Sequence, residues 1–307
     1  MSEAATARPA DLAPPLARYQ GAAPPAPAWF REAVDAPHER NRLTVDGAEI
    51  EWLAWGRRGR PGLLLLHGNG AHADWWRFIA PFFAATHRVA TLSWGGMGNS
   101  DHRPRYTMDL FVEELLAVAE AAGLSETGPF TTVGHSFGGF PMMALANRPG
   151  QPMGHAVILD TPFDLQQRRR PRGTGGDARP HNIYATEAEA LARFRWAPPQ
   201  PTTHDYIADF IARLSIRPTE GGFTWKFDPF LWSEFEAQSG FDPLLAPKCP
   251  VTLMWGERSE LVHGGLVDDM VGRLPAGSRL VPIPEAFHHV MADQPLALVS
   301  ALRALLA

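Results

Sequence analysis

A serine in a glycine-rich turn, between a strand pattern and a helix pattern, restricts this chain to few folds. Residues 130–133 are aromatic and β-branched, as in a strand, and residues 141–147 favour a helix. Between them, residues 134–138 read Gly-His-Ser-Phe-Gly. Such a turn strains the serine backbone and exposes its hydroxyl above a sheet, and it needs glycine where neighbouring backbone passes closely. Ser136 is therefore a candidate nucleophile, although the motif alone also fits an ordinary turn.

Strand patterns alternate with helix patterns over most of the chain. A hairpin is predicted at residues 43–55, further strands at 63–66, 87–94, 130–133, 155–160, 251–256 and 279–283, and helices at about 74–85, at about 107–122 and from 295 to the end. This alternation predicts an α/β fold with a doubly wound, mostly parallel sheet. In such a sheet, functional residues gather in loops beyond the carboxyl ends of the strands.

Three regions are expected from the change of pattern along the chain. They are an Ala/Pro-rich N-terminal arm at residues 1–37, a core formed by 38–162 and 242–307, and an inserted helical cap at 163–241. The arm lacks the apolar core of a secretory signal and is interpreted as extended or mobile. Within the cap, helices are predicted at 186–196 and 204–215. A basic run at 166–176 is interpreted as a solvated connector rather than an anion site.

The composition disfavours several classes of partner. The net charge of -5 arises from 28 basic and 33 acidic residues, a balance that suggests neither a nucleic-acid groove nor a membrane-seeking surface. No segment approaches the roughly eighteen consecutive apolar residues of a membrane span. We therefore expect a cytoplasmic protein without nucleic-acid or membrane partners. The twelve histidines show no H-E-x-x-H spacing and the single cysteine forms no C-x-x-C, so neither a metal nor a cofactor is expected.

A serine nucleophile needs a base, an acid that orients the base, and donors for the oxyanion. The base is expected in the loop after the last predicted strand, where His288 and His289 occur side by side. The remaining groups are expected in the loops after other strands, because the carboxyl ends of parallel strands meet at one edge of the sheet.

Together these motifs resemble the α/β-hydrolase-fold serine hydrolases that carry a helical cap. The resemblance extends from about residue 43 to the C-terminus, apart from the details of the cap. It is carried by His67-Gly-Asn-Gly70, Gly98-Asn-Ser-Asp101, Gly134-His-Ser-Phe-Gly-Gly139, Trp255-Gly-Glu-Arg-Ser-Glu260 and His288-His-Val-Met-Ala-Asp-Gln-Pro295. In the family pattern the catalytic histidine lies seven residues before the proline that opens the last helix, which selects His288. His289 is then a neighbour that packs or forms hydrogen bonds nearby.

The acid departs from the family pattern. Many members have Gly-Glu-x-Asp after the strand at 251–256, but this chain has Ser259 in place of the aspartate. A subset has the acid one position later, which makes Glu260 the first choice. Asp160, at the end of the strand after the nucleophile helix, is the second choice, because some relatives have their acid there. Glu257 is the third choice and is more plausibly a carboxylate that stabilises the loop.

The resemblance also implies where the oxyanion and the substrate bind. The backbone N–H groups of Phe137 and Asn69 are the expected oxyanion donors. Substrate contacts are expected from four side chains, namely Trp75, Trp225, Trp232 and His135. Aromatic side chains from the cap would suit the roof of an apolar pocket.

The function implied is hydrolysis of a carboxylic ester of a small to medium, partly apolar substrate through an acyl-enzyme on Ser136. Carbon–carbon bond hydrolysis and lactone hydrolysis by the same triad are alternatives. A third alternative, from another class, is a non-catalytic receptor for a small ligand on the same fold. The serine argues against haloalkane dehalogenase and epoxide hydrolase chemistry, which in this fold has aspartate at the elbow. The sequence does not indicate an oligomeric state.

Overall fold

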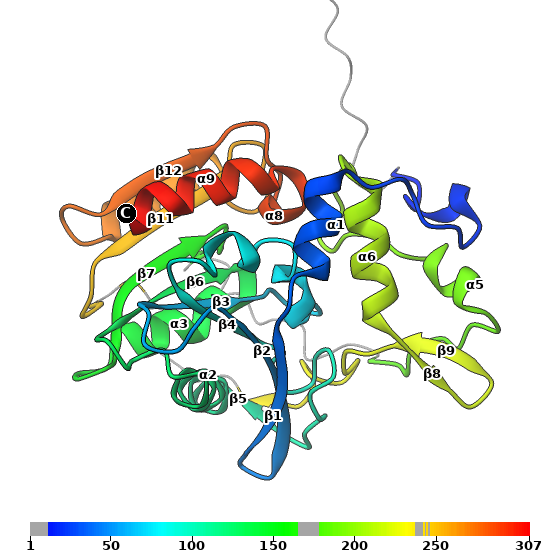
Figure 1. The fold of residues 1–307 in the computed structure, drawn as a ribbon, viewed down its shortest axis with the longest axis horizontal. Helices are drawn as coiled ribbons and strands as arrows, with labels where there is room; N and C mark the ends of the chain where they lie inside the picture. Colours follow the sequence, from blue (N-terminus) through cyan, green and yellow to red (C-terminus); the bar gives the residue numbers. More distant parts are fainter. Residues whose placement is uncertain (1–11, 165–177, 237–241, 243, 245) are drawn as a thin grey trace, which may run out of the picture.

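The computed structural model describes residues 12–164, 178–236, 242, 244 and 246–307 (Figure 1). Its centre is an eight-stranded sheet in the order β1-β2-β4-β3-β6-β7-β11-β12. The strands are β1 (Glu39–Val45), β2 (Ala48–Trp55), β3 (Gly62–Leu66), β4 (Arg88–Leu92), β6 (Phe130–His135), β7 (Met153–Leu159), β11 (Val251–Gly256) and β12 (Arg279–Ile283). β2 pairs antiparallel with β1 and β4, and all other pairs in this sheet are parallel. The predicted α/β fold with a mostly parallel sheet is confirmed.

Both faces of the sheet are covered, which explains why the central strand β3 is continuously apolar. Leu63 and Leu65 of β3 contribute to one apolar cluster, and Leu64 and Leu66 contribute to the other. The first cluster includes side chains of α1 (Ala28–Asp35) and α9 (Pro295–Leu306), and the second those of α2 (Met108–Ala122), α3 (Gly139–Ala146) and α7 (Gly264–Arg273). This alternation is the two-residue period of a β-strand.

The helix predicted at about 74–85 is wrong. The structure has two short 3-10 helices there, η3 (Ala73–Trp76) and η4 (Ala80–Phe83). Pro81 lies within this segment, where it lacks an N–H donor and disfavours a helical conformation in the preceding residue. The apolar period of the segment is real, because Trp76, Phe78 and Phe83 are buried.

The segment expected to form a cap, which keeps that name below, contains α5 (Glu187–Leu191) and α6 (Asp205–Ser215), which correspond to the two predicted helices. It also contains an antiparallel hairpin of β8 (Ile216–Thr219) and β9 (Gly222–Trp225). It is tied to the core where β10 (Phe235–Glu236) pairs with β5 (Tyr106–Thr107). The Tyr106 hydroxyl also donates a hydrogen bond of 2.7 Å to Asp228 Oδ2. The basic run at 166–176, interpreted above as a connector, lies outside the described residues.

The N-terminal arm is not simply extended. Residues 1–11 lie outside the described residues, but residues 28–35 form α1, which lies beside α6 of the cap (Figure 1). Phe30 of α1 is 4% exposed, and its ring lies 4.9 Å from that of Tyr206 and 5.6 Å from that of Phe210. The interpretation of this segment as an extended or mobile arm is therefore wrong. The surrounding proline-rich stretches obscured a short helix whose apolar face is stabilised by tertiary packing.

Phe30→Ala is expected to lower the free energy of unfolding by about 3 to 4 kcal/mol, because it removes a buried aromatic ring and leaves a cavity between α1 and α6. Denaturant unfolding followed by circular dichroism measures this change. Phe30→Leu, which keeps most of the apolar volume, is expected to cost less than about 1.5 kcal/mol. An unfolding free energy unchanged in the alanine variant would show that the packing of α1 contributes nothing to stability.

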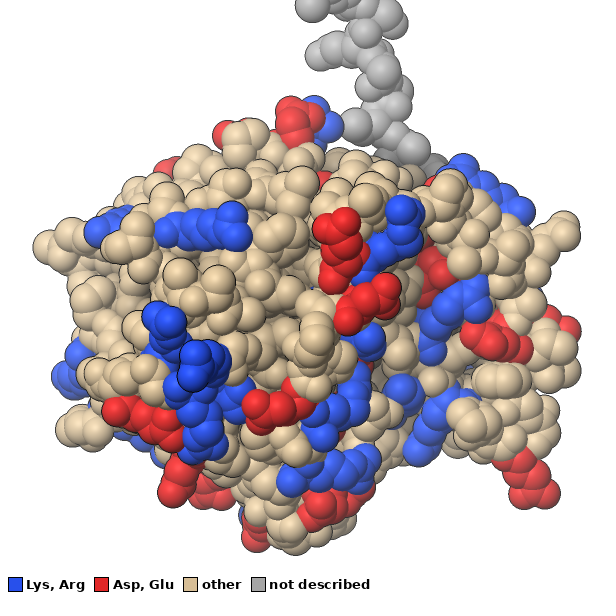
Figure 2. Space-filling view, in the orientation of Figure 1, with Lys and Arg blue, Asp and Glu red and all other residues tan. Residues whose placement is uncertain are grey.

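The surface shown in Figure 2 carries charges of both signs, with Lys and Arg side chains interspersed among Asp and Glu side chains. The ion pairs of the described residues include Arg213 with Glu187, at 3.1 Å. Among the described residues, none of the helices has both the length and the apolar composition that crossing a bilayer would require.

Candidate active site

The strand, turn and helix predicted around Ser136 are present. Ser136 follows β6 at the start of the 3-10 helix η5 (Ser136–Gly138), which continues into α3, and it has a φ of +51°. A Cβ atom on Gly134 would lie 2.8 Å from the carbonyl oxygen of Gly138, and one on Gly138 would lie 2.7 Å from the carbonyl oxygen of His67. Both distances are too short for any side chain, so the two glycines allow the sharp turn that presents the serine.

His288 is hydrogen-bonded to this serine. It lies in the loop after β12, is 3% exposed, and has its Nε2 atom 3.0 Å from Ser136 Oγ. Its Nδ1 atom lies 2.7 Å from Asp160 Oδ1. Because a carboxylate only accepts hydrogen bonds, the proton of the neutral ring belongs on Nδ1, and Nε2 carries the lone pair that faces the serine hydroxyl. The ring is therefore oriented to accept the serine proton.

Asp160 follows β7 and is completely buried, with a φ of +47°. Besides His288, its carboxylate accepts hydrogen bonds from the Ser259 hydroxyl, at 2.7 Å, and from the Gly256 backbone N–H, at 2.8 Å. A buried carboxylate needs such donors to compensate for the water that it has lost. The three hydrogen bonds hold Asp160 in one orientation against His288.

The structure contradicts the first choice of acid, Glu260, which is exposed, as is the third choice, Glu257. The second choice, Asp160, makes the hydrogen bond to His288. The physical reason lies in the strand order, since β7 is between β6 and β11 and its end is therefore adjacent to the nucleophile turn. Ser259, in the place where many family members have the acid, donates its hydroxyl proton to Asp160.

Two further histidines pack beside His288. His135 Nε2 lies 3.0 Å from the backbone carbonyl oxygen of His288 and donates to it, and the His289 ring contacts those of Trp75 and Trp196. Burial, together with the adjacent His288, holds the pKa values of His135 and His289 well below the usual histidine range. His135 and Trp75, expected to contact substrate, are 1% and 7% exposed. Their burial favours a packing role.

The other expected site residues lie in different surroundings. Trp232 is 39% exposed, its ring lies 5.6 Å from that of Phe137, and its Nε1–H donates to Asn69 Oδ1 at 3.1 Å. The loop that carries Asn69 passes the nucleophile, because a Cβ atom on Gly68 would lie 3.0 Å from Ser136 Cβ. The oxyanion role of the Phe137 and Asn69 amides stays a prediction. Trp225 is on β9, where its aromatic contact, with Tyr184, is internal to the cap.

A cap residue that the sequence did not reveal connects to the histidine loop. Gln200 is 6% exposed, its Oε1 accepts from the His289 N–H at 2.9 Å, and its Nε2 lies 2.9 Å from both carboxylate oxygens of Asp293. Asp293 in turn accepts from the Phe287 N–H at 2.9 Å. These hydrogen bonds fix the backbone at Phe287 and His289, on either side of His288. Asp293 is part of the motif quoted above, but no local pattern indicates that Gln200 reaches it.

The burial of Asp293 is expected to make the stability of the protein depend on pH. Burial raises the pKa of Asp293 to about 7. The folded chain therefore binds this proton more tightly than the unfolded chain, whose pKa is about 4, and stability falls as pH rises between these values. We expect the Tm of Asp293→Asn, relative to that of the unchanged protein, to rise between about pH 5 and about pH 8. Thermal unfolding followed by circular dichroism measures it.

The matched control for this prediction is Asp268→Asn, which changes an exposed carboxylate on α7. Its Tm is expected to follow that of the unchanged protein at every pH. Parallel Tm curves for Asp293→Asn and the unchanged protein would contradict the assignment of a raised pKa to Asp293.

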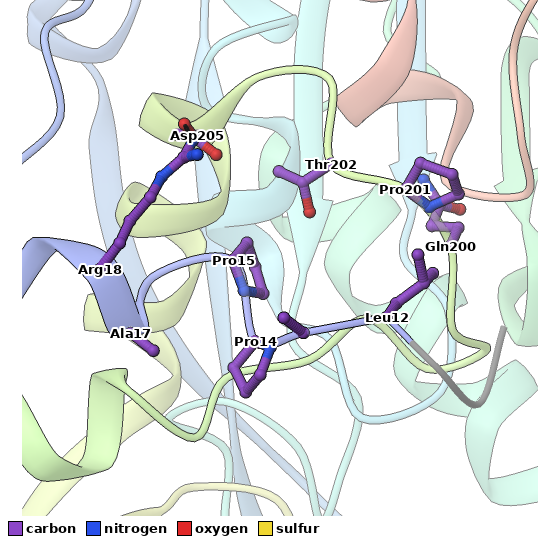
Figure 3. A pocket seen from close by; sticks show the side chains of 10 residues that line it. Leu12, Pro14, Pro15, Ala17, Arg18, Gln200, Pro201, Thr202 and Asp205 are labelled. Carbon is purple, nitrogen blue, oxygen red and sulfur yellow. Dashed lines mark hydrogen bonds and ion pairs between the residues drawn. The ribbon is translucent and has the colours of Figure 1, made fainter. Parts of the chain in front are cut away.

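A groove of about 350 Å³ lies between the N-terminal segment and the loop before α6 (Figure 3). Its lining includes Leu12, Pro15, Thr202 and, at one end, Arg18 with Asp205. Ser136, His288 and Asp160 are not among the residues that line it. Gln200, which does line it, is the link between this groove and the loop of His288.

Known proteins share this architecture. A family model described as "alpha/beta hydrolase fold" matches residues 61–295. Epoxide hydrolase 3 of Xenopus tropicalis is 24% identical to this chain, over 92% of this chain and 81% of its own length. Esterase Rv0045c of Mycobacterium tuberculosis is 25% identical, over 85% of this chain and 88% of its own length. By contrast, the match with human epoxide hydrolase 4, at 29% identity, covers 37% of this chain and 31% of that protein.

Solved structures agree with the family match. The thioesterase domain from the curacin biosynthetic pathway superposes with a TM-score of 0.73 at 21% identity, covering 87% of this chain and all of that domain. A structure of esterase Rv0045c superposes with a TM-score of 0.71 at 23% identity, covering 91% of this chain and 96% of that one. The resemblance inferred from the motifs is confirmed, and the relatives support hydrolase activity in general. This chain belongs to the alpha/beta hydrolase fold family.

Proposed function

We propose that this protein is a serine hydrolase that cleaves a carboxylic ester of a small to medium, partly apolar substrate. The observation that carries the proposal is the hydrogen-bonded series from Ser136 Oγ through the His288 ring to the Asp160 carboxylate, with distances of 3.0 and 2.7 Å. This is the arrangement that a serine hydroxyl needs to become a nucleophile at neutral pH. Family membership supports hydrolysis, and a serine in this position favours acyl transfer.

In the first half of the reaction, Ser136 Oγ attacks the ester carbonyl carbon while its proton passes to His288 Nε2. The carbonyl oxygen becomes an oxyanion, for which we assign the N–H groups of Phe137 and Asn69 as donors. The Phe137 amide is at the start of η5, where helical N–H groups have no partner within the helix. The tetrahedral intermediate then loses the alcohol, which takes the proton from His288, and Ser136 is left acylated.

In the second half, water attacks the acyl carbon and gives a proton to His288, and the proton then returns to Ser136 as the carboxylic acid leaves. Asp160 stays ionised throughout. Its carboxylate holds the Nδ1 proton and stabilises the positive charge that His288 carries in each transition state. The donors from Ser259 and Gly256 keep this carboxylate in place.

Epoxide opening is disfavoured at this site, although several similar proteins are named as epoxide hydrolases. Attack of a serine hydroxyl on an epoxide carbon would produce an ether. An ether has no carbonyl carbon for water to attack, so the oxyanion donors and His288 could not release the product. An ester attached to the serine, by contrast, is hydrolysed by the same groups that formed it.

The surroundings of Ser136 favour a substrate with an apolar part. Phe137 follows the nucleophile, and its ring contacts those of Trp232 and Phe111 at 5.6 and 5.1 Å. Trp232 and Phe230 are two of the large apolar side chains of the described residues that stay exposed, at 39% and 37%. An apolar acyl or alcohol group bound against Trp232 would remove this surface from water.

The proposal is tested by labelling with a fluorophosphonate probe and by a panel of esters graded in acyl and alcohol size, with a lactone series beside it. We expect one probe molecule per chain, attached to Ser136, and turnover of apolar esters of small to medium size. Labelling elsewhere, or no labelling together with no hydrolysis, would contradict the proposal and favour a non-catalytic receptor. Faster turnover of the lactones would contradict the choice of ester.

A further inference from the structure

Three buried histidines meet at the proposed active site, and we call His135, His288 and His289 the histidine cluster. They are 1%, 3% and 3% exposed, and one ligand nitrogen of each lies within 4.8 Å of those of the other two. The ring centroids of His135 and His289 are each 4.9 Å from that of His288. The catalytic proposal uses His288 alone and assigns no chemistry to the other two side chains.

Several ring nitrogens of the cluster lack hydrogen-bond partners among the described residues, which is unusual for buried atoms. His135 Nε2 donates to the His288 carbonyl, so its Nδ1 carries the lone pair, and this atom has no hydrogen-bond partner among the described residues. Neither ring nitrogen of His289 makes a hydrogen bond of acceptable geometry within the described structure. The Pro198 carbonyl favours a proton on one of them, which leaves the lone pair on the other. Buried polar atoms without partners are rare, and a bound water or ion would satisfy these lone pairs.

We infer that the histidine cluster binds a divalent transition-metal ion such as Zn²⁺, and that the bound ion inhibits the enzyme. Neutral imidazole is a preferred ligand of Zn²⁺, Cu²⁺ and Ni²⁺, whereas Mg²⁺ and Ca²⁺ prefer oxygen. A tetrahedral zinc site with bonds of 2.0 to 2.1 Å needs its nitrogens about 3.4 Å apart. One ring nitrogen of each histidine now lies within 4.8 Å of the other two, so this set would have to approach by at most about 1.4 Å.

The ion would compete with the proton transfer of the proposed mechanism. The lone pair of His288 that is available to a metal is on Nε2, because Nδ1 is bonded to Asp160, and Nε2 is the atom that must accept the serine proton. Ser136, which is bonded to this Nε2 atom, is only partly buried, so an ion on the cluster would lie beside the position where the substrate carbonyl must bind. Inhibition, though not binding itself, therefore rests on the proposed function.

The first test measures binding without activity. Equilibrium dialysis with Zn²⁺ is expected to give one tightly bound ion per chain, and Mg²⁺ none. Co²⁺ bound to the unchanged protein is expected to give the intense visible absorption of a four-coordinate site. His289→Phe, which keeps an aromatic ring between Trp75 and Trp196, is expected to weaken Zn²⁺ binding at least about tenfold, through the loss of one of three ligands. The matched control, His87→Phe, changes a partly exposed histidine outside the cluster and is expected to leave binding unchanged.

The second test follows ester hydrolysis with increasing Zn²⁺. Each rate is expressed relative to the metal-free rate of the same variant, so a change in basal activity does not enter the comparison. Zn²⁺ is expected to inhibit the unchanged protein, reversibly with a chelator, and His289→Phe is expected to need at least about tenfold more ion for the same inhibition.

The two tests separate this inference from the proposed function. Binding of Zn²⁺ by a chain that hydrolyses no ester would support the metal site and contradict the serine-hydrolase proposal. An active enzyme that binds no Zn²⁺ would overturn the metal site and leave the function standing. The same conclusion would follow if the His289→Phe variant bound Zn²⁺ as tightly as the unchanged protein. If His289→Phe does not fold, the Co²⁺ spectrum of the unchanged protein decides, since an octahedral spectrum or none would overturn the site.

Discussion

Ser136→Ala is expected to lower kcat for ester hydrolysis by at least about three orders of magnitude, because only the oxyanion donors and substrate binding would remain to promote attack by water. The alanine lacks the Oγ atom that lies 3.0 Å from His288 Nε2, so no acyl-enzyme can form. The measurement is a steady-state rate with the best ester of the panel, beside a burst experiment that detects the acyl-enzyme in the unchanged protein.

The control for this variant is Ser125→Ala, which removes the hydroxyl of an exposed serine after α2 and should retain full activity. Circular dichroism should show that Ser136→Ala is folded, since alanine occupies the same backbone position with one atom fewer. A near-normal rate in a folded Ser136→Ala protein would exclude Ser136 as the nucleophile.

Asp160→Asn is expected to lower kcat by about three to four orders of magnitude. The carboxylate both sets the proton on His288 Nδ1 and stabilises the imidazolium that forms during catalysis, and a neutral amide does neither reliably. The amide NH2 replaces one carboxylate oxygen, so it would face either the Gly256 N–H, which now donates to Oδ2, or the Ser259 hydroxyl and His288 Nδ1, which now bond to Oδ1. KM is expected to change much less than kcat, because Asp160 is completely buried behind His288.

Glu260→Gln is the matched comparison for Asp160→Asn, since it makes the same chemical change in the exposed carboxylate of the neighbouring loop. We expect its kcat to stay within about twofold of the unchanged protein, because an exposed charge is screened by water. The opposite result, a severe loss in Glu260→Gln with a mild one in Asp160→Asn, would mean that the loop rearranges in solution and that Glu260 serves as the acid.

Local patterns predicted the nucleophile turn because its constraint is local. Ser136 needs a positive φ and glycines where backbone passes closely, and these requirements leave a mark within five consecutive residues. The resemblance to the family selected His288 over His289, because the family's catalytic histidine lies seven residues before the proline that opens the last helix. The strand at 63–66 followed from its continuously apolar run, and the parallel sheet followed from the alternation of strand and helix patterns.

The partner of His288 could not be chosen in this way. Asp160 and Ser259 are separated by 99 positions and meet only because β7 and β11 are neighbours in the sheet. The sequence alone offered several carboxylates at strand ends, and the family pattern favoured the wrong one. Gln200 was missed for the same reason, since it acts on the loop of His288 from a different part of the chain.

The sequence by itself determined the fold family, the nucleophile turn and the histidine after the last strand, because each depends on residues close together in the chain. Three-dimensional contacts determined that Asp160 rather than Glu260 faces His288, that the N-terminal segment packs on the cap through α1, and that His135 joins His288 and His289. His135 and His288 are 153 positions apart, so no spacing motif can record their meeting. Such contacts depend on which strands are neighbours, and strand order is a property of the folded chain.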